Sequence, residues 1–293
     1  MKTKIALFFL LFFGVATHVF SQVTPKDTTK KDTTKLQKIV ETIIKDTTPR
    51  KEETKKDTLV AKKLEKHFYG IRQFGYETYL WAKTPFHWRN TDWERFGITV
   101  AGTGTLMAFD ESLNKLSQGN QRYYYSVPVV GGRIYGEWYT IGAITLAFGG
   151  YGILAHDTGT KKIAIELFQA GVYAEAVTEV LKFITGRARP LQNEGAFQYH
   201  PFNVNSLYES FPSGHATSAF ALSTVMFRHA HSTFWKVMSF VPAGFTVFSR
   251  FYQDWHWPSD LFFGSATGFA TGMWVVTLHE KKLHKINIPA DNK

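Results

Sequence analysis

The chain has 293 residues, of which 44% are hydrophobic and 16% aromatic, so it can bury a large core in one or two domains. It contains no cysteine, which excludes disulfide bonds, thiolate catalysis and cysteine-ligated metals. A formal net charge of +10 could indicate nucleic-acid binding, but many of the lysines lie in one N-terminal segment, where they are mixed with acidic residues. We therefore expect no nucleic-acid partner.

Residues 1–21 have the pattern of a secretory signal peptide. Lys2 and Lys4 precede an apolar run from Ile5 to Phe13, and small or weakly polar residues lead to Ser21, after which we expect cleavage. An uncleaved membrane anchor is the alternative. Either reading predicts a chain that is exported or inserted into a membrane.

Residues 22–66 are rich in Lys, Thr, Asp and Glu, contain no aromatic residue and repeat the tetrapeptide KDTT three times. Such a segment buries too little apolar surface to offset the entropy lost on ordering, which predicts a disordered polar linker. A basic arm that binds phosphate groups is the alternative. Residues 67–95 mix aromatic and charged side chains every three or four positions, which indicates an amphipathic segment at a membrane interface or an ordinary surface helix.

Residues 96–280 alternate apolar and polar segments and predict an all-α, membrane-embedded bundle of about five to six core helices. Residues 96–109 are apolar but short for a membrane span, and residues 111–137 are expected to form loop or interfacial structure. The helices that we expect cover residues 138–155, 161–185, 214–227, 234–248 and 261–278.

Two of these helices carry features that constrain their surroundings. The helix at 161–185 contains Glu166, Glu175 and Glu179, which must face water or the protein interior if the helix lies in lipid. In the helix at 261–278, glycines recur at every fourth position, at residues 264, 268 and 272. This spacing predicts a smooth strip against which another helix packs closely.

Basic residues predict the orientation in the membrane, because lysine and arginine in short loops favour the cytoplasmic side. We place these residues in two loops and in a basic C-terminal tail at 281–293; they are Lys161, Lys162, Arg228, Lys236, Lys281, Lys282 and Lys285. The polar stretches between them would then face outward if residues 96–109 do not fully cross the membrane, and we predict that they do not. This predicts the inner membrane of a bacterial cell envelope, with the functional face toward the periplasm.

Three polar stretches stand at predicted helix ends, so they can converge on one face. They are KFITGRARP at 182–190, FPSGHATS at 211–218 and SRFYQDWHWPSD at 249–260. Arginine presents a planar fork of donors that suits phosphate, histidine exchanges a proton near neutral pH, and a carboxylate can fix the tautomer of a histidine. Together the three stretches predict a phosphate-handling site.

In this order, the stretches resemble the signature of the type 2 phosphatidic acid phosphatase superfamily, which also includes bacterial acid phosphatases and vanadium haloperoxidases. The family pattern is Lys, six residues, Arg-Pro; then Pro-Ser-Gly-His; then Ser-Arg, five residues, His, three residues, Asp. Every fixed position is matched here. The resemblance covers residues 161–278, within an expected phosphatase domain of residues 96–280.

The resemblance implies the roles of the site residues. His215 would be the nucleophile that forms a phosphohistidine, His256 would protonate the leaving oxygen and then activate water, and Asp260 would orient His256. No metal or cofactor would be required. The residues that the resemblance assigns to phosphate binding are Lys182, Arg189, Ser213, Gly214 and Arg250.

Some neighbouring residues lie outside the family pattern. Arg187 could contact substrate or pair with Glu175 or Glu179, and we favour a structural role. The two glutamates are expected to pair with Lys182 and the arginines rather than to donate protons. Residues 191–210 form a long connection that carries Glu194, Tyr199, His200 and Tyr208, and we expect a substrate-selecting lid or a plain surface loop.

The resemblance and the apolar segments together predict a metal-independent phosphatase acting on a lipid phosphomonoester or pyrophosphate. Candidate substrates are phosphatidate-type lipids, phosphatidylglycerophosphate, undecaprenyl pyrophosphate and the phosphate groups of lipid A. The alternatives are a soluble periplasmic non-specific acid phosphatase, a vanadate-dependent haloperoxidase, and a non-catalytic lipid-binding protein.

Overall fold

The structure is a computed structural model that describes residues 70–118 and 121–287, with side chains described as far as Lys281. The predicted signal peptide (1–21) and linker (22–66) lie outside the described residues. The chain divides into two compact units, whose described parts are residues 70–89 and the residues from Asn90 onward.

The described residues of the predicted segment 67–95, which are residues 70–95, do not form one continuous helix. Helix α4 (Ile71–Lys83) ends before the 3-10 turn η1 (Thr84–His87), and residues 90–95 belong to the next helix. Proline at position 85 explains the break, because it has no backbone N–H to continue the helical hydrogen bonds. The placement of this segment at a membrane interface stays a prediction.

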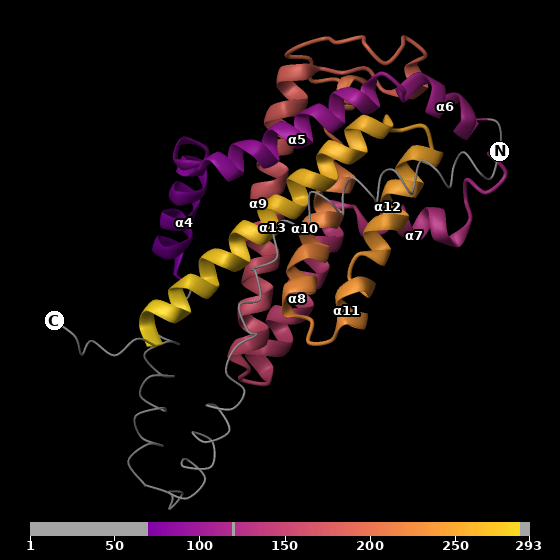
Figure 1. The fold of residues 1–293 in the computed structure, drawn as a ribbon. Coiled ribbons are helices and arrows are strands. Elements are labelled where there is room, and N and C mark those ends of the chain that lie inside the picture. Colours follow the sequence, from indigo (N-terminus) through magenta and orange to yellow (C-terminus); the bar gives the residue numbers. More distant parts are fainter. Residues whose placement is uncertain (1–69, 119–120, 288–293) are drawn as a thin grey trace, which may run out of the picture. The chain divides into compact units, whose positions relative to one another are not determined.

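The second unit is a helical domain, and the described residues contain no β-strand, so the predicted all-α fold is confirmed. Two further 3-10 turns, η2 (Pro190–Gln192) and η3 (Ser206–Tyr208), lie in its longest connection. Its helices are α5 (Asn90–Met107), α6 (Asp110–Gln118), α7 (Val127–Tyr135), α8 (Trp138–Leu154), α9 (Thr158–Thr185), α10 (Gly214–His229), α11 (Thr233–Met238), α12 (Val241–Tyr252) and α13 (Pro258–Asn287) (Figure 1).

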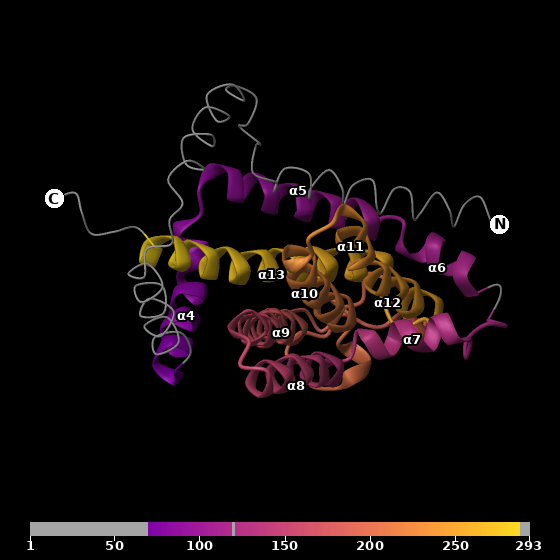
Figure 2. The same ribbon diagram turned by 90° about the horizontal axis from the view of Figure 1, so that it is seen from below.

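Helix α10 forms the centre of the domain. Every residue from Ala216 to Val225 is buried, and most of them are alanine, serine or threonine. Figure 2 shows α10 between α13 and α9, and the helix also packs against α12. Small side chains let these neighbours approach closely, so the start of α10 is held by three helices.

The predicted glycine strip on α13 faces α10. A Cβ atom at Gly268 would lie 2.1 Å from the carbonyl oxygen of Thr217, and one at Gly264 would lie 2.6 Å from the carbonyl oxygen of Ser213. Gly272 likewise adjoins Thr224 on α10. Because Ser213 immediately precedes α10, this close packing brings the second motif next to the third.

Two of our local predictions are wrong. Residues 234–248 do not form one helix, since α11 ends at Met238 and Pro242 stands in the first turn of α12, where its missing N–H costs nothing. Residues 111–137 contain α7 and all but the first residue of α6, so the loop alternative is wrong, while interfacial structure stays a prediction. The two helices here have nine residues each, and the apolar runs in this region are too short to indicate them.

Basic residues that we placed in loops and in a tail lie on helices instead. Lys161 and Lys162 are in the first turns of α9, which begins after an Asp157 cap that accepts a hydrogen bond from the backbone of Gly159. Arg228 is in the last turn of α10. Helix α13 continues through Asn287, so the expected tail at 281–293 begins as helix.

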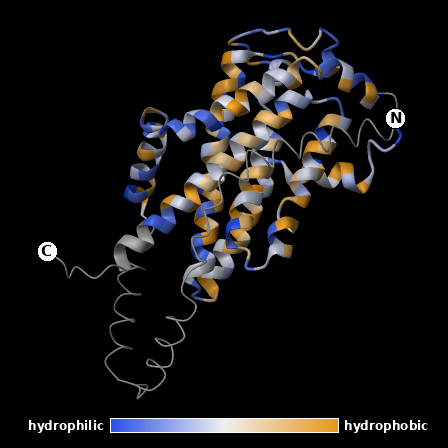
Figure 3. Cartoon of the chain, in the orientation of Figure 1, coloured by the Kyte–Doolittle hydropathy of each residue, from blue (hydrophilic) through white to orange (hydrophobic). Residues whose placement is uncertain are grey.

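Apolar side chains remain exposed on several helices of the domain. On α8 the exposed set includes Leu146 and Leu154, and on α9 it includes Phe168 and Val180. Figure 3 shows hydrophobic residues along the lengths of these helices. One described helix, Pro258–Lys281 within α13, is long and apolar enough to cross a membrane, and 56% of its most apolar window is buried.

We predict that Gly268→Ala destabilises the domain, because the new methyl group has to displace a backbone oxygen of α10. Overpacking of this kind costs roughly 1–3 kcal/mol, which lowers the melting temperature. Gly142→Ala on α8 is the matched control. Among the described residues, no atom outside the adjoining backbone of α8 lies within 4 Å of its Cβ position, so its melting temperature should stay the same or rise slightly. Equal melting temperatures for the two variants would contradict the packing argument.

Candidate active site

The three motifs meet at one end of the bundle. Lys182 lies near the end of α9, His215 in the first turn of α10, Arg250 near the end of α12, and His256 in the connection to α13. The rings of His215 and His256 are 6.4 Å apart between centroids. A Cβ atom at Gly214 would lie 3.2 Å from Nζ of Lys182, so the first motif adjoins the second.

His215 is positioned by the start of α10. The hydroxyl of Ser213 caps the helix by accepting a hydrogen bond from the Ala216 N–H at 3.4 Å, and the Ser213 N–H donates to the carbonyl of Asp260 at 3.1 Å. Nε2 of His215 lies 3.5 Å from Nη1 of Arg250. Backbone N–H groups at a helix start attract anions, so this nitrogen stands where a phosphate group would be bound.

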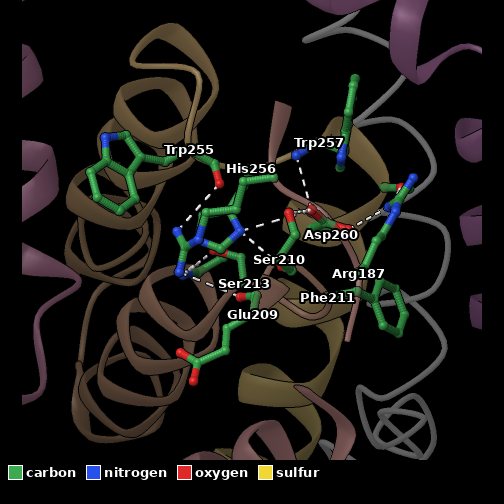
Figure 4. A network of polar contacts seen from close by, with 12 residues as sticks. Arg187, Glu209, Ser210, Phe211, Ser213, Trp255, His256, Trp257 and Asp260 are labelled. Atoms are coloured by element: carbon green, nitrogen blue, oxygen red, sulfur yellow. Dashed lines mark hydrogen bonds and ion pairs between the residues drawn. The ribbon is translucent and has the colours of Figure 1, made fainter. Parts of the chain in front are cut away.

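His256 is fully enclosed, and its tautomer is set by a backbone carbonyl. Nδ1 lies 2.9 Å from the carbonyl oxygen of Ser210, which can only accept, so Nδ1 carries a proton and donates it (Figure 4). Burial lowers the pKa of His256 to about 3, and the nearby Arg189 cation acts in the same direction. The ring is therefore neutral at ordinary pH, and its Nε2 lone pair can accept a proton.

Asp260 does not bond His256 directly. Its Oδ2 atom is 3.8 Å from Nδ1, beyond hydrogen-bond distance, although the two groups still attract each other. The carboxylate instead accepts hydrogen bonds from the Ser210 hydroxyl at 2.6 Å and from the Trp257 N–H at 2.9 Å (Figure 4). Asp260 thus orients His256 through Ser210, whose hydroxyl bonds the acid and whose carbonyl bonds the histidine.

Arg187 is wholly buried and lies between two carboxylates. Its Nη2 donates to Asp110 at 2.7 Å and its Nη1 to Asp260 at 2.5 Å, while Ser259 joins both Arg187 and Asp110. Our expected partners, Glu175 or Glu179, are therefore wrong, although the structural role is supported. Burial raises the pKa of Asp110 to about 6 even though Arg187 draws it down.

Sequence reasoning missed Asp110, because nothing in its local pattern marks it. It begins α6, and 77 residues separate it from the arginine that it binds. Glu175 and Glu179 have other partners: Glu175 accepts a hydrogen bond from Ser218, and Glu179 binds Lys182 at 2.6 Å, as predicted.

The two remaining arginines of the motifs are held by neutral oxygen atoms. Arg189 donates through Nε to the carbonyl of Ser206 at 2.7 Å, with longer bonds of 3.4 and 3.5 Å to two further carbonyls. Arg250 donates through Nη2 to the side-chain oxygen of Gln253. Neutral acceptors fix these guanidinium groups without cancelling their charge, so both remain available to an anion.

Trp255 lies against both of these arginines. The guanidinium carbon of Arg189 is 4.8 Å from the centre of the Trp255 ring, and that of Arg250 is 5.6 Å away. The negative face of an indole ring attracts such cations. Sequence reasoning missed this role, although the tryptophan adjoins His256 in the third motif.

Two arginines of the first motif form hydrogen bonds with the long connection at 191–210. Arg187 donates to the carbonyl of Ala196 at 2.9 Å, and the N–H of Arg189 donates to the carbonyl of Leu207 at 3.1 Å. Within the loop, Glu194 is 3.1 Å from both His200 and Tyr208. The backbone of the loop is thus tied to the site, and its role as a lid stays a prediction.

Two histidines, a buried acid and three cations thus lie together at one end of the bundle. Residues 164–284 match the family model of the PAP2 superfamily. The resemblance drawn from the three motifs is confirmed.

Several known proteins are similar to the chain. It is 35% identical to a lipid A 1-phosphatase of Rhizobium johnstonii and 34% identical to one of Rhizobium etli, in each case over 116 residues and 36% of this chain. A lipid A 1-phosphatase of Porphyromonas gingivalis is 37% identical over 65 residues, which are 22% of this chain. The aligned segments span 43%, 46% and 15% of these relatives, less than half of their lengths.

Two solved structures are also similar. Aquifex aeolicus LpxE aligns with a TM-score of 0.45 and 22% identity, covering 58% of this chain and 95% of that one. A PAP2-type phosphatidylglycerolphosphate phosphatase from Bacillus subtilis aligns with a TM-score of 0.49 and 19% identity, covering 66% of this chain and 97% of that one.

We predict that Arg187→Met strongly destabilises the domain, because it leaves two buried carboxylates without their cation. Breaking a buried ion pair by removing one partner costs about 3–5 kcal/mol. Arg228→Met is the matched control, since Arg228 pairs with a Glu280 whose side chain is 40% exposed, and such a pair contributes about 1 kcal/mol or less. Equal losses in the free energy of unfolding would show that the Arg187 network is not specially stabilising.

The pKa of His256 predicts a loss of stability in acid. The unfolded chain takes up a proton on this histidine below its ordinary pKa of 6.5, whereas the folded protein does so only near 3. The unfolded state therefore binds more protons across that interval, and the free energy of unfolding should fall as the pH falls. His256→Gln has no such group and should show a shallower pH dependence in denaturant titrations; an identical slope would contradict the prediction.

Proposed function

We propose that the protein is a metal-independent phosphatase that hydrolyses a lipid phosphomonoester or pyrophosphate through a phosphohistidine. The observation that carries this proposal is the position of three cations near His215, with a second histidine beside it. Arg250 lies next to its Nε2, Arg189 acts on its charge, and Lys182 adjoins the preceding Gly214. Arg250 also has a buried Nε–H that finds no hydrogen-bond partner among the described residues. A phosphate oxygen would satisfy this donor.

The first half of the reaction transfers the phosphoryl group to His215. The lone pair of Nε2 attacks phosphorus, and the bond from phosphorus to the leaving oxygen breaks, so that its electron pair stays on that oxygen. Burial and nearby cations lower the pKa of His256, and the arriving phosphate dianion raises it again, so that His256 takes up a proton and passes it to the leaving oxygen. The three cations stabilise the charge on the non-bridging oxygens.

The second half returns the enzyme to its starting form. Neutral His256 accepts a proton from water through Nε2, because Nδ1 is committed to the Ser210 carbonyl. The resulting hydroxide oxygen bonds to phosphorus, and the electrons of the P–N bond return to Nε2 of His215. Phosphate leaves, His256 releases its proton to solvent, and both histidines are neutral again.

A lipid is the favoured substrate because apolar side chains are exposed along the helices that lead to the site, including Val180, Phe183 and Ile184 near the end of α9. Such a surface can lie in hydrocarbon while a phosphate head group enters the polar end. The similar lipid A 1-phosphatases support the phosphate groups of lipid A as the first candidates. We place the protein in the inner membrane of a bacterial envelope, with the site toward the periplasm.

The test is phosphate release from a panel of lipids by the purified full-length protein in detergent with a metal chelator present. The panel contains lipid A, phosphatidate, phosphatidylglycerophosphate, undecaprenyl pyrophosphate and a soluble aryl phosphate. His215→Ala should reduce turnover by about three orders of magnitude or more, because it removes the nucleophile. His231→Ala, which changes an exposed histidine after α10, should match the wild type. Undiminished turnover by His215→Ala would overturn the proposal.

A further inference from the structure

A carboxylate that belongs to none of the three motifs lies against the proposed nucleophile. Oε1 of Glu137 is 3.2 Å from Nε2 of His215, closer than Arg250, whose Nη1 lies 3.5 Å from the same nitrogen. Glu137 stands between α7 and α8, as the residue that precedes Trp138. Its side chain thus reaches the atom that would attack phosphorus.

The backbone before Glu137 is built to bring it there. A Cβ atom at Gly136 would lie 2.8 Å from the carbonyl oxygen and 3.0 Å from the Cβ atom of His215, so only glycine allows this approach. One turn earlier, a Cβ atom at Gly132 would lie 2.2 Å from the carbonyl oxygen of Phe245 on α12. Two close backbone approaches therefore fix the segment that carries Glu137 against the site.

The chemistry of this contact opposes attack by His215. A hydrogen bond from His215 lowers the pKa of Glu137, and the cations Arg250 and Arg133 act in the same direction, so the carboxylate is ionised. An ionised carboxylate only accepts hydrogen bonds, which requires that Nε2 carry the proton. A protonated Nε2 has no lone pair for phosphorus.

A phosphate group and the Glu137 carboxylate also compete for one place. Both are anions. Glu137 binds the Nε2 edge of His215 and is attracted by Arg250, and a phosphate at the site would do the same. Two anions in contact at a partly buried site repel each other strongly. The Glu137 side chain is 25% exposed, so it has solvent on one side into which it can rotate.

We propose that Glu137 is a substrate-displaced latch, a carboxylate that occupies the phosphate-binding position beside His215 and must rotate away before attack. This inference rests on the proposed function, in which Nε2 is the nucleophile. On displacement, Nε2 releases its proton to solvent and Nδ1 takes one up, so the imidazole stays neutral and its lone pair faces phosphorus. The latch weakens the binding of every phosphate ligand, because the ligand has to displace Glu137.

The latch has a kinetic signature that distinguishes it from a positioning role. If Glu137 only competes with phosphate, its removal lowers KM and leaves kcat almost unchanged. If Glu137 instead orients His215 for attack, its removal lowers kcat with little change in KM. The two roles therefore move different constants.

The experiment compares Glu137→Gln and Glu137→Ala with the wild type in the full-length protein. Orthovanadate binding is measured by isothermal titration calorimetry, and KM and kcat are measured on the best substrate of the panel. Both substitutions remove the charged hydrogen bond between Glu137 and His215, which a ligand would otherwise have to break. Vanadate binding should therefore become tighter and KM lower, each by about tenfold, with kcat changed less than about twofold. Glu280→Gln, which alters a surface carboxylate bound to Arg228, is the matched control and should leave all three constants unchanged.

Unchanged or weaker vanadate binding by both folded Glu137 variants would overturn the latch, and so would a loss of kcat without a fall in KM. Melting temperatures equal to that of the wild type show that the variants are folded. Two substitutions are used so that the test remains possible if one variant does not fold. If the wild type binds vanadate but hydrolyses nothing in the panel, the proposed function fails while tighter binding by the variants still supports a latch at an anion site.

Discussion

The buried guanidinium of Arg187 is the interaction on which the site depends. It joins Asp110 at the start of α6 to Asp260 at the start of α13, and it holds the long connection through the carbonyl of Ala196. Three charges taken out of water carry a large desolvation cost, which is offset only when each has close partners of good geometry. Every group in this network has such partners, so the helix starts that carry the site are held in one relative position.

The same network sets the state of the second histidine. Asp260 is held in place by Arg187 and accepts a hydrogen bond from the Ser210 hydroxyl. The Ser210 carbonyl in turn accepts a hydrogen bond from the Nδ1–H of His256. The proton on Nδ1 leaves Nε2 to exchange protons with substrate and water. Burial and Arg189 keep the ring neutral, so it becomes an acid only when an anion enters beside it. Acid catalysis is thereby coupled to substrate binding.

The sequence predicted the parts of this arrangement that have local patterns. The three motifs stand at helix ends, and the four-residue period of Gly264, Gly268 and Gly272 indicated close helix packing, which the contacts with α10 confirm. Residues that meet across long sequence separations left no such pattern: Asp110 and Glu137 are single acids in ordinary surroundings, and only the fold brings them to Arg187 and His215. The predicted helix boundaries were wrong where a proline begins a new helix inside an apolar run.

Three of the groups that would contact phosphate already have partners within the protein. Lys182 binds the carboxylate of Glu179, Arg250 binds the amide oxygen of Gln253, and His215 contacts Glu137. A phosphate must exchange with the two carboxylates, Glu179 and Glu137, so its net binding energy is smaller than the three cations alone would provide. A transition state, which carries more charge on the same oxygens, gains more from the exchange than a bound substrate does. The cost of displacing the internal acceptors is the same for both states, so it weakens substrate binding without reducing the preference of the site for the transition state.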